Sequence, residues 1–169
     1  FSFILLKSPQ LNAFAAPGGI IGVNGGLFLY AQNEGEFASV LAHELAHLSQ
    51  RHFARGLEAR QQMQIPMMAA MLGGIIAMAA GAGDAGVAAI ASSQAAAMQA
   101  QQRFSRQNEQ EADRIGMQTL GNAGYDPRSM PDMFNRLMSQ YRYNSKPPEF
   151  LMSHPVTESR IADTRNRAE

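Results

Sequence analysis

The chain has 169 residues, and hydrophobic side chains make up 46% of them. This length and composition suit a single globular domain with its own core and exclude a disordered chain. Fourteen basic and fourteen acidic side chains cancel, so no net field favours nucleic acid or an anionic membrane as a partner. The absence of cysteine excludes disulfides and thiolate metal sites. Because the chain starts at Phe1 with neither an initiator methionine nor a leader, we interpret it as a piece of a longer or processed protein.

The N-terminal third changes from strand patterns to a helical pattern. Residues 2–6 form a short apolar run that predicts a strand. Residues 11–31 contain further apolar runs, which are interrupted by Pro-Gly-Gly at 17–19 and by Asn-Gly-Gly at 24–26. Such residues favour tight turns between strands. We therefore expect a sheet of two or three strands. Residues 34–56 carry apolar side chains at helical spacing, which predicts a helix.

The middle of the chain is unusually poor in charge. Residues 67–83 carry no charged side chain and consist mainly of Ala, Gly and Met. Their length approaches that of a membrane span, but Ala and Gly are weakly hydrophobic and Asp84 follows. Residues 85–103 are rich in Ala and Gln and suit a helix. We interpret residues 65–100 as a hydrophobic helical hairpin or lid, either buried or in contact with a surface, and a bilayer-spanning helix is the alternative.

The C-terminal part carries three more helical patterns. They predict helices over 105–120, within 125–141 and within 154–167, where Thr157 is a suitable N-cap. Together the elements predict an α+β fold, in which residues 1–169 form one mostly helical domain with a small β-sheet.

The stretch His43-Glu44-Leu45-Ala46-His47 has the pattern HExxH within the first predicted helix. Residues four apart share a helix face, so both imidazoles can bind one metal ion, as in catalytic zinc sites. Glu44 is rotated by about 100° from His43. Its carboxylate can therefore take a proton from a water on the metal and pass it to a leaving amine. A chance match on a surface helix is the alternative, and the apolar flanks of the motif disfavour it.

A catalytic zinc needs a third protein ligand and an open position. The extended motif that supplies a third histidine fails, because Gln50 and Phe53 occupy the required positions. We interpret His52 either as an ordinary surface histidine or as one that contacts a metal ligand without binding the metal itself. The remaining candidates are glutamates on other segments: Glu58, Glu109, Glu111, Glu149 and Glu158.

Glu109 is the favoured third ligand. Glu109 and Asp113 are four residues apart and share a helix face. Glu109 can then bind the metal while Asp113 accepts the N–H of a ligand histidine and fixes its tautomer. The alternative is a solvated acidic helix face.

These residues resemble the gluzincin metallopeptidases. More narrowly, residues 43–47 together with 108–113 are similar to the motifs of the family of the type I CAAX prenyl protease and the bacterial HtpX heat-shock protease. Residues 12–28 and 153–161 also resemble segments of that family, so the resemblance spans nearly the whole chain.

The resemblance implies one Zn²⁺ per chain, held by His43, His47 and Glu109, with Glu44 as the catalytic base. It also implies that Asp113 is a proton donor. The spacing alone favours an orienting role for Asp113, and both roles stay open.

The resemblance further implies a zinc endopeptidase of the bacterial periplasm that serves quality control and assembly of outer-membrane β-barrel proteins. Its partners would be misfolded or stalled outer-membrane proteins and the barrel-assembly machinery. In such relatives a tetratricopeptide-repeat domain follows a domain of this kind, and these 169 residues contain none. Membrane relatives carry transmembrane helices, whereas this chain has only residues 67–83. We therefore expect an enzyme that stays in solution and can touch a membrane peripherally.

Two further roles follow from family-like segments. His154 can occupy the fourth position on the zinc and hold the enzyme inactive, or it can stabilise the oxyanion, and a simple helix cap is the alternative. The strand near Asn12–Phe14 can be an exposed edge onto which an extended substrate adds.

Two other functions remain open at this level. A chaperone-like assembly factor with a latent or repressed zinc site would use the Met-rich segment for binding. An integral membrane protease would use residues 67–83 as a span.

Overall fold

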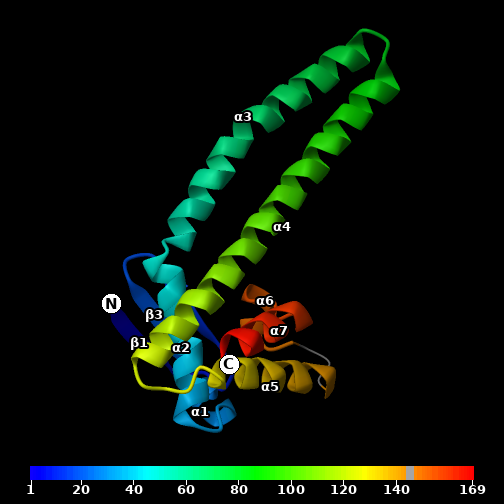
Figure 1. The fold of residues 1–169 in the computed structure, drawn as a ribbon. Helices are drawn as coiled ribbons and strands as arrows, with labels where there is room; N and C mark the ends of the chain where they lie inside the picture. Colours follow the sequence, from blue (N-terminus) through cyan, green and yellow to red (C-terminus); the bar gives the residue numbers. More distant parts are fainter. Residues whose placement is uncertain (144–146) are drawn as a thin grey trace. The chain divides into compact units, whose positions relative to one another are not determined.

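The computed structural model describes residues 1–143 and 147–169, and the chain divides into two compact units. The first unit consists of residues 1–51 and 108–169, and the second unit consists of residues 52–107. Most described residues lie in helices, and the strands form one small sheet (Figure 1). The α+β class predicted from the sequence is therefore confirmed.

The sheet of the first unit has three strands, β1 (Ser2–Leu6), β2 (Ala13–Ala16) and β3 (Ile20–Asn24). Their order is β1-β3-β2, with β1 parallel and β2 antiparallel to β3. The predicted sheet is confirmed, and β2 is one of its edge strands. The ring of Phe14 on β2 lies over Gly22 on β3, where a larger side chain would collide with it.

Residues 24–26 do not form the predicted turn between strands. Instead, α1 (Gly25–Tyr30) begins directly after β3. Gly26 lies against the backbone carbonyls of Pro9 and Gln10, so this position needs a residue without a side chain. The strand expected after the turn is therefore wrong, because the glycine serves a close approach of two segments and not a reversal of the chain.

The helix that carries the HExxH pattern, α2 (Glu34–Ser49), is shorter than predicted. It begins after Asn33, whose side-chain oxygen accepts a hydrogen bond from the backbone N–H of Glu36 at 2.9 Å. It ends before the predicted Gly56, because Arg51 adopts a left-handed backbone with a φ of 54°. An arginine is not a usual residue for this conformation, so no local pattern predicts the break.

A partly buried ion pair fixes the start of α2 to α5 (Ser129–Tyr143). The carboxylate of Glu36 accepts hydrogen bonds from Nη2 of Arg136 at 2.6 Å and from its Nε at 3.1 Å. It also accepts the backbone N–H of Gln32 at 2.8 Å. Because Glu36 is buried and the pairing is bidentate, it orients the first turn of α2 against α5.

A single long helix, α4 (Gly83–Asn122), replaces the two predicted over 85–103 and 105–120. The predicted separation is wrong because no glycine or proline interrupts the helix between them. The helix ends at Asn122, two residues after the predicted end, and Gly124 follows with a φ of 84°.

Three shorter helices complete the first unit. The helix predicted within 125–141 is confirmed as α5, and α6 (Glu149–Ser153) and α7 (Glu158–Arg167) follow. Thr157 caps α7 as predicted, because its hydroxyl accepts a hydrogen bond from the backbone N–H of Arg160 at 3.2 Å.

The core of the first unit lies where α2 packs on β2 and α5, and where α5 packs on α7. This packing holds the HExxH helix rigidly between the sheet and the C-terminal helices. Large apolar side chains that are almost completely buried here are Ile21, Leu27, Leu120, Met130, Met133, Phe134, Leu137 and Phe150.

The second unit is a helical hairpin made of α3 (His52–Ala79) and the part of α4 up to residue 107 (Figure 1). The two helices approach each other closely at two glycines. A side chain on Gly86 would collide with the backbone carbonyl of Gly74, and one on Gly74 would collide with Ile90. Small residues at this contact therefore let the two helix backbones touch.

Candidate metal centre

The two histidines of the HExxH pattern lie on one face of α2, as their spacing predicts. Nε2 of His43 lies 3.0 Å from Nε2 of His47. His43 is 1% exposed and His47 is half-buried. Two imidazole nitrogens thus point to the same place, which is the arrangement that a metal ion needs.

Glu109 reaches the same place from α4. Its Oε2 lies 3.4 Å from Nε2 of His43, and its Oε1 lies 3.5 Å from Nε2 of His47. The structure therefore brings together the two histidines and the glutamate that the sequence singled out as the third ligand.

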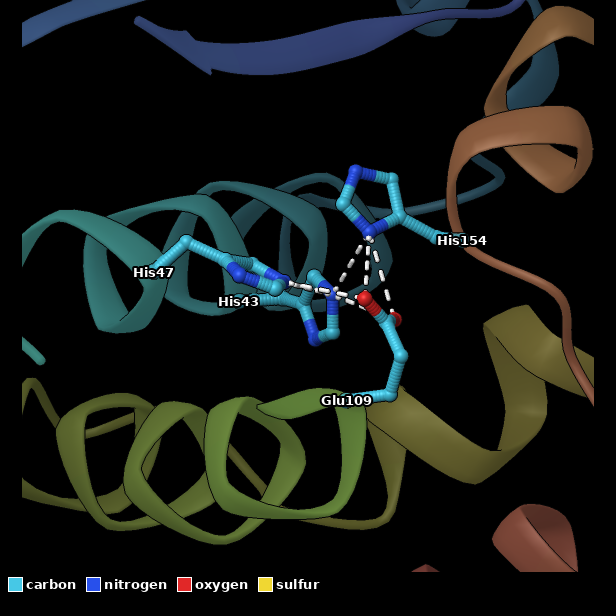
Figure 2. Close-up of side chains that lie close together, drawn as sticks. All are labelled: His43, His47, Glu109 and His154. Carbon is cyan, nitrogen blue, oxygen red and sulfur yellow. Dashed lines mark hydrogen bonds and ion pairs between the residues drawn. The ribbon is translucent and has the colours of Figure 1, made fainter. Parts of the chain in front are cut away.

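His154, at the end of α6, completes the cluster. Its Nδ1 lies 3.4 Å from Nε2 of His43 and 3.1 Å from Oε1 of Glu109. Figure 2 shows all four side chains directed at one point from three separate parts of the chain. One ligand atom from each of His43, His47, Glu109 and His154 lies within 4.8 Å of the other three, so this group can hold a metal ion.

The position of His154 comes from α6. The backbone N–H of His154 donates to the carbonyl of Phe150 at 2.8 Å, and the two rings lie 4.9 Å apart. The backbone N–H of Phe150 in turn reaches the carbonyl of Leu11, just before β2, at 3.5 Å. These contacts place the imidazole over the HExxH helix.

Asp113 lies one helical turn after Glu109 and contacts the other nitrogen of His43. Its Oδ1 is 2.9 Å from Nδ1 of His43. A carboxylate in this place favours a proton on Nδ1 and so leaves Nε2 free to bind a metal. The geometry matches the orienting contact predicted from the spacing.

Arg160, on α7, is a site residue that the sequence analysis missed. Its Nε and Nη2 each donate to a different oxygen of Asp113 at 2.7 Å, and its Nη1 lies 3.0 Å from Oε2 of Glu109. The guanidinium also lies 4.9 Å from the ring centre of Phe134 and is 4% exposed. Two features of the sequence could have indicated Arg160. It lies in the family-like segment 153–161, and the acidic face formed by Glu109 and Asp113 needs a cation to balance it.

The charges of these groups shift one another's pKa values. Burial lowers the pKa of His43, but the neighbouring Asp113 and Glu109 raise it to about 10. Burial raises the pKa of Glu109, but His154 and His43 hold it well below its usual range. The pKa of Asp113 is also lowered, since Arg160 and His43 outweigh the effect of burial. Without a metal, a proton on His43 thus takes over part of a cation's role.

Glu44 supplies a test of whether a metal fits. It is 0% exposed, and burial raises the pKa of its carboxyl group. Within the described residues neither carboxylate oxygen has a well-formed hydrogen bond. Its polar neighbours are Nε2 of His154 at 3.4 Å and the backbone of Ala15 on β2. Buried carboxylate oxygens normally accept hydrogen bonds. Their lack of a well-formed one here fits a site in which a metal ion would bring a hydrogen-bond donor close to Glu44.

The charge balance points the same way. Three carboxylates, those of Glu44, Glu109 and Asp113, are buried beside one guanidinium, that of Arg160. When His43 is neutral and all three carboxylates are ionised, one positive charge stands against three negative ones among the described residues, an excess that a divalent cation would cancel. The donor set of imidazole nitrogens and a carboxylate oxygen is suited to such an ion.

Two other sequence expectations have structural outcomes. β2 is an edge strand that packs against α2, as expected for the strand near Asn12–Phe14. His52 belongs to the second unit and is 5% exposed, so of its two interpretations the surface histidine is wrong. It lies outside the group that can hold a metal ion. Its neighbour Arg51 breaks the helix, and His52 therefore does not continue the face that periodicity assigned to it.

We expect metal binding to release a proton from His43. Because its pKa is raised from 6.5 to about 10, the charged form stabilises the metal-free fold fully below pH 6.5, and this contribution is lost as the pH rises towards 10. A metal must displace that proton, so its affinity should rise with pH over this range. Calorimetric titration with Zn²⁺ at neutral pH, in buffers of different ionisation enthalpy, should give about one proton per ion. Asp113→Asn should release fewer protons, and an unchanged heat across the buffers would contradict the assignment.

We expect Arg160→Gln to weaken metal binding, because Asp113 and Glu109 lose the cation that holds them in place. Loss of such a supporting contact typically costs about 10–100-fold in metal affinity. Competition with a chromogenic chelator would measure this, and Arg160→Lys should recover part of the loss. Arg165→Gln, an exposed arginine on the same helix, is the matched control and should bind metal normally. A lower melting temperature with unchanged metal affinity would show that Arg160 is only structural.

Comparison with known proteins agrees with the site. The model of a family described as Peptidase family M48 matches residues 1–168. The β-barrel assembly-enhancing protease of Escherichia coli (strain K12) is 45% identical over 168 residues, which are 99% of this chain and 34% of that protein. The protein of the same name from Yersinia pestis is 46% identical over the same shares.

A more distant relative is the mitochondrial metalloendopeptidase OMA1 of Arabidopsis thaliana, 29% identical over 137 residues, which are 79% of this chain and 25% of that protein. The chain spans about a third of the length of the bacterial relatives it matches. The metallopeptidase resemblance found in the motifs is confirmed: the chain belongs to peptidase family M48.

Proposed function

We propose that residues 1–169 form the peptidase domain of a zinc-dependent endopeptidase. The observation that carries this proposal is the convergence of His43, His47 and Glu109 beside the buried carboxyl group of Glu44, which lacks a well-formed hydrogen bond. Zinc bound by these residues supplies Lewis acidity, which polarises a carbonyl group and lowers the pKa of water. We propose one such ion per chain.

Glu44 is the proton carrier in this proposal. Hydrolysis breaks the peptide C–N bond and adds the elements of water, so one proton has to move from the attacking water to the departing nitrogen. The Glu44 carboxylate accepts that proton and then donates it to the amine. Its burial matters, because burial raises the pKa of the carboxyl group. A carboxylate with a raised pKa is a stronger base than an exposed glutamate.

Asp113 has a positioning role in this proposal. Its carboxylate is held by both Nε and Nη2 of Arg160 and contacts Nδ1 of His43, and its pKa is lowered. A carboxyl group that stays ionised at neutral pH has no proton to donate. These contacts favour the orienting role over the proton donor implied by the family resemblance.

We propose that His154 is a fourth metal ligand that keeps the site closed. Its Nδ1 lies within the group that can hold the ion, while its Nε2 lies 3.4 Å from Oε1 of Glu44. A zinc site with four protein ligands has no open position for catalysis. His154 therefore competes with substrate at the metal and with water at Glu44, and it has to leave for hydrolysis to proceed.

β2 is the proposed binding strand for an extended peptide. It is an edge of the sheet, it packs against α2, and the backbone of Ala15 lies close to Glu44. A peptide that adds to this edge would place its own backbone beside the general base.

We propose that the protein acts in the bacterial periplasm on outer-membrane proteins that are misfolded or stalled during assembly, together with the barrel-assembly machinery. The support is the name of the bacterial relatives, which refers to enhancement of β-barrel assembly by a protease. The alternative is a chaperone-like assembly factor in which His154 keeps the zinc site latent.

Glu44→Gln separates these two functions. The substitution keeps the shape of the side chain but removes its ability to accept a proton, and it leaves the ligand group intact. We expect bound zinc at the wild-type level and a loss of casein cleavage of at least about 10²-fold. Glu34→Gln, an exposed glutamate in the first turn of α2, is the control and should cleave normally. Full cleavage by Glu44→Gln would contradict the proposed chemistry.

His154→Ala tests the closed state. If the imidazole blocks the fourth position, its removal should raise the rate of casein cleavage while zinc remains bound through the other three ligands. An oxyanion-stabilising histidine predicts the opposite, a fall of about 10²–10³-fold in kcat. Unchanged activity with unchanged zinc would remove His154 from both roles. His52→Ala is a useful control, because His52 lies outside the metal-binding group.

A further inference from the structure

The helical hairpin of the second unit has an unusual distribution of charge. Residues 61–102 contain a single charged side chain, Asp84, near the turn between α3 and α4. The flanking helical segments are basic: Arg55, Arg60, Arg103 and Arg106 are all exposed, against one acidic side chain, Glu58. The neutral total of the whole chain hides this local pattern.

One face of α3 is both apolar and exposed. Its members follow helical spacing at i, i+3, i+7, i+10 and i+11 and are 50–76% exposed. Gly74, which contacts α4, lies on the opposite side of the helix. We name these five side chains the outer face of α3; they are Ile65, Met68, Leu72, Ile75 and Ile76.

A helix that meets water normally carries polar residues on the side turned away from its partner. α3 does the reverse. It is 28 residues long and long stretches of it are apolar, yet nearly all of this apolar surface is exposed. By length and composition alone it could cross a membrane. The apolar surface therefore needs an environment other than water.

The partner helix restricts which environment fits. The side of α4 opposite Gly86 carries mainly alanines, with Gln99 and Gln102 among them. The hairpin is thus strongly apolar on one side and weakly polar on the other. This asymmetry suits a helix pair that lies in the interface of a bilayer, with one side towards the acyl chains, more than one surrounded by hydrocarbon.

The charges suit the same arrangement. Arg60 precedes the first member of the outer face by five residues, about 7.5 Å along the helix axis. The exposed Phe53 adds an aromatic ring in the same basic segment of α3. Guanidinium groups at this place can reach lipid phosphates while the apolar side chains lie deeper.

We propose that the outer face of α3 docks onto a lipid surface that contains anionic headgroups. Ile65, Met68, Leu72, Ile75 and Ile76 contact the acyl chains, and the arginines of the hairpin contact the phosphates. None of these residues belongs to the metal-binding group, so the docking does not depend on the proposed peptidase activity.

The test is co-flotation of the 169-residue chain with vesicles of phosphatidylethanolamine and phosphatidylglycerol. The triple variant Leu72→Gln, Ile75→Gln and Ile76→Gln should lower the bound fraction more than tenfold. The matched control, Ala88→Gln, Ala91→Gln and Ala95→Gln on the exposed side of α4, should bind as the wild type does. Circular dichroism and zinc content would confirm that both variants fold. Equal binding of the two triple variants would overturn the proposal.

Depth is the second measurement. Because the chain has no cysteine, Ile75→Cys and Ala95→Cys each give a single site for an environment-sensitive dye. We expect vesicles to shift the emission at position 75 and leave position 95 unchanged. A shift at both positions would indicate a hairpin surrounded by hydrocarbon and would overturn docking at the surface.

Sedimentation without vesicles addresses a protein partner. If the wild type self-associates, and the triple variant of α3 is monomeric yet still floats with vesicles, the outer face binds a second copy and the proposal fails. Substitution of Arg60 and Arg103 by Gln should weaken binding to these vesicles and leave binding to neutral phosphatidylcholine vesicles unchanged. Equal loss on both lipids would contradict the proposed contact with phosphates.

Discussion

The excess of buried negative charge around His43 governs the architecture of the first unit. Glu44, Glu109 and Asp113 are all less than a tenth exposed, and Arg160 is the guanidinium that contacts two of them. Such a group of carboxylates is costly to bury unless each has a cation or a donor close by. The helices that supply these side chains, α2, α4 and α7, are therefore held to one mutual arrangement. A metal ion fits this arrangement because it would replace the proton that His43 carries without it and bring further positive charge to the carboxylates.

Rigid support for α2 follows from the same constraint. The bidentate pair between Glu36 and Arg136 fixes its first turn, while β2 and α5 pack along its length. Its last turn ends at the left-handed Arg51. Two imidazoles can share one ion only if the turn that carries them does not move, so these distant contacts serve the site as much as the core.

The parts of the site that the sequence revealed are those set by local geometry. His43, Glu44 and His47 follow from helical spacing, and Glu109 with Asp113 follows from a second i, i+4 pair joined to the family resemblance. Arg160 was not found, because a single arginine on a polar helix carries no pattern until the fold places it against two carboxylates. The same limit explains the fold. The strands and the cap at Thr157 have local signals, whereas the close approach at Gly26 and the break at Arg51 arise from tertiary packing.

The position of His154 links the strand edge to the metal site. α6 is tied to the segment before β2 by the hydrogen bond from Asn12 to Glu149 at 3.1 Å and by the backbone contact between Phe150 and Leu11. The histidine that fills the fourth position is therefore anchored beside the edge strand proposed to receive a peptide. A substrate that adds to β2 enters next to those anchors, so the contacts that keep the site closed and those that would recognise a peptide share one region of the chain. Closure of the site and binding of substrate are then competing uses of the same surface, and the balance between them depends on a helix of only five residues.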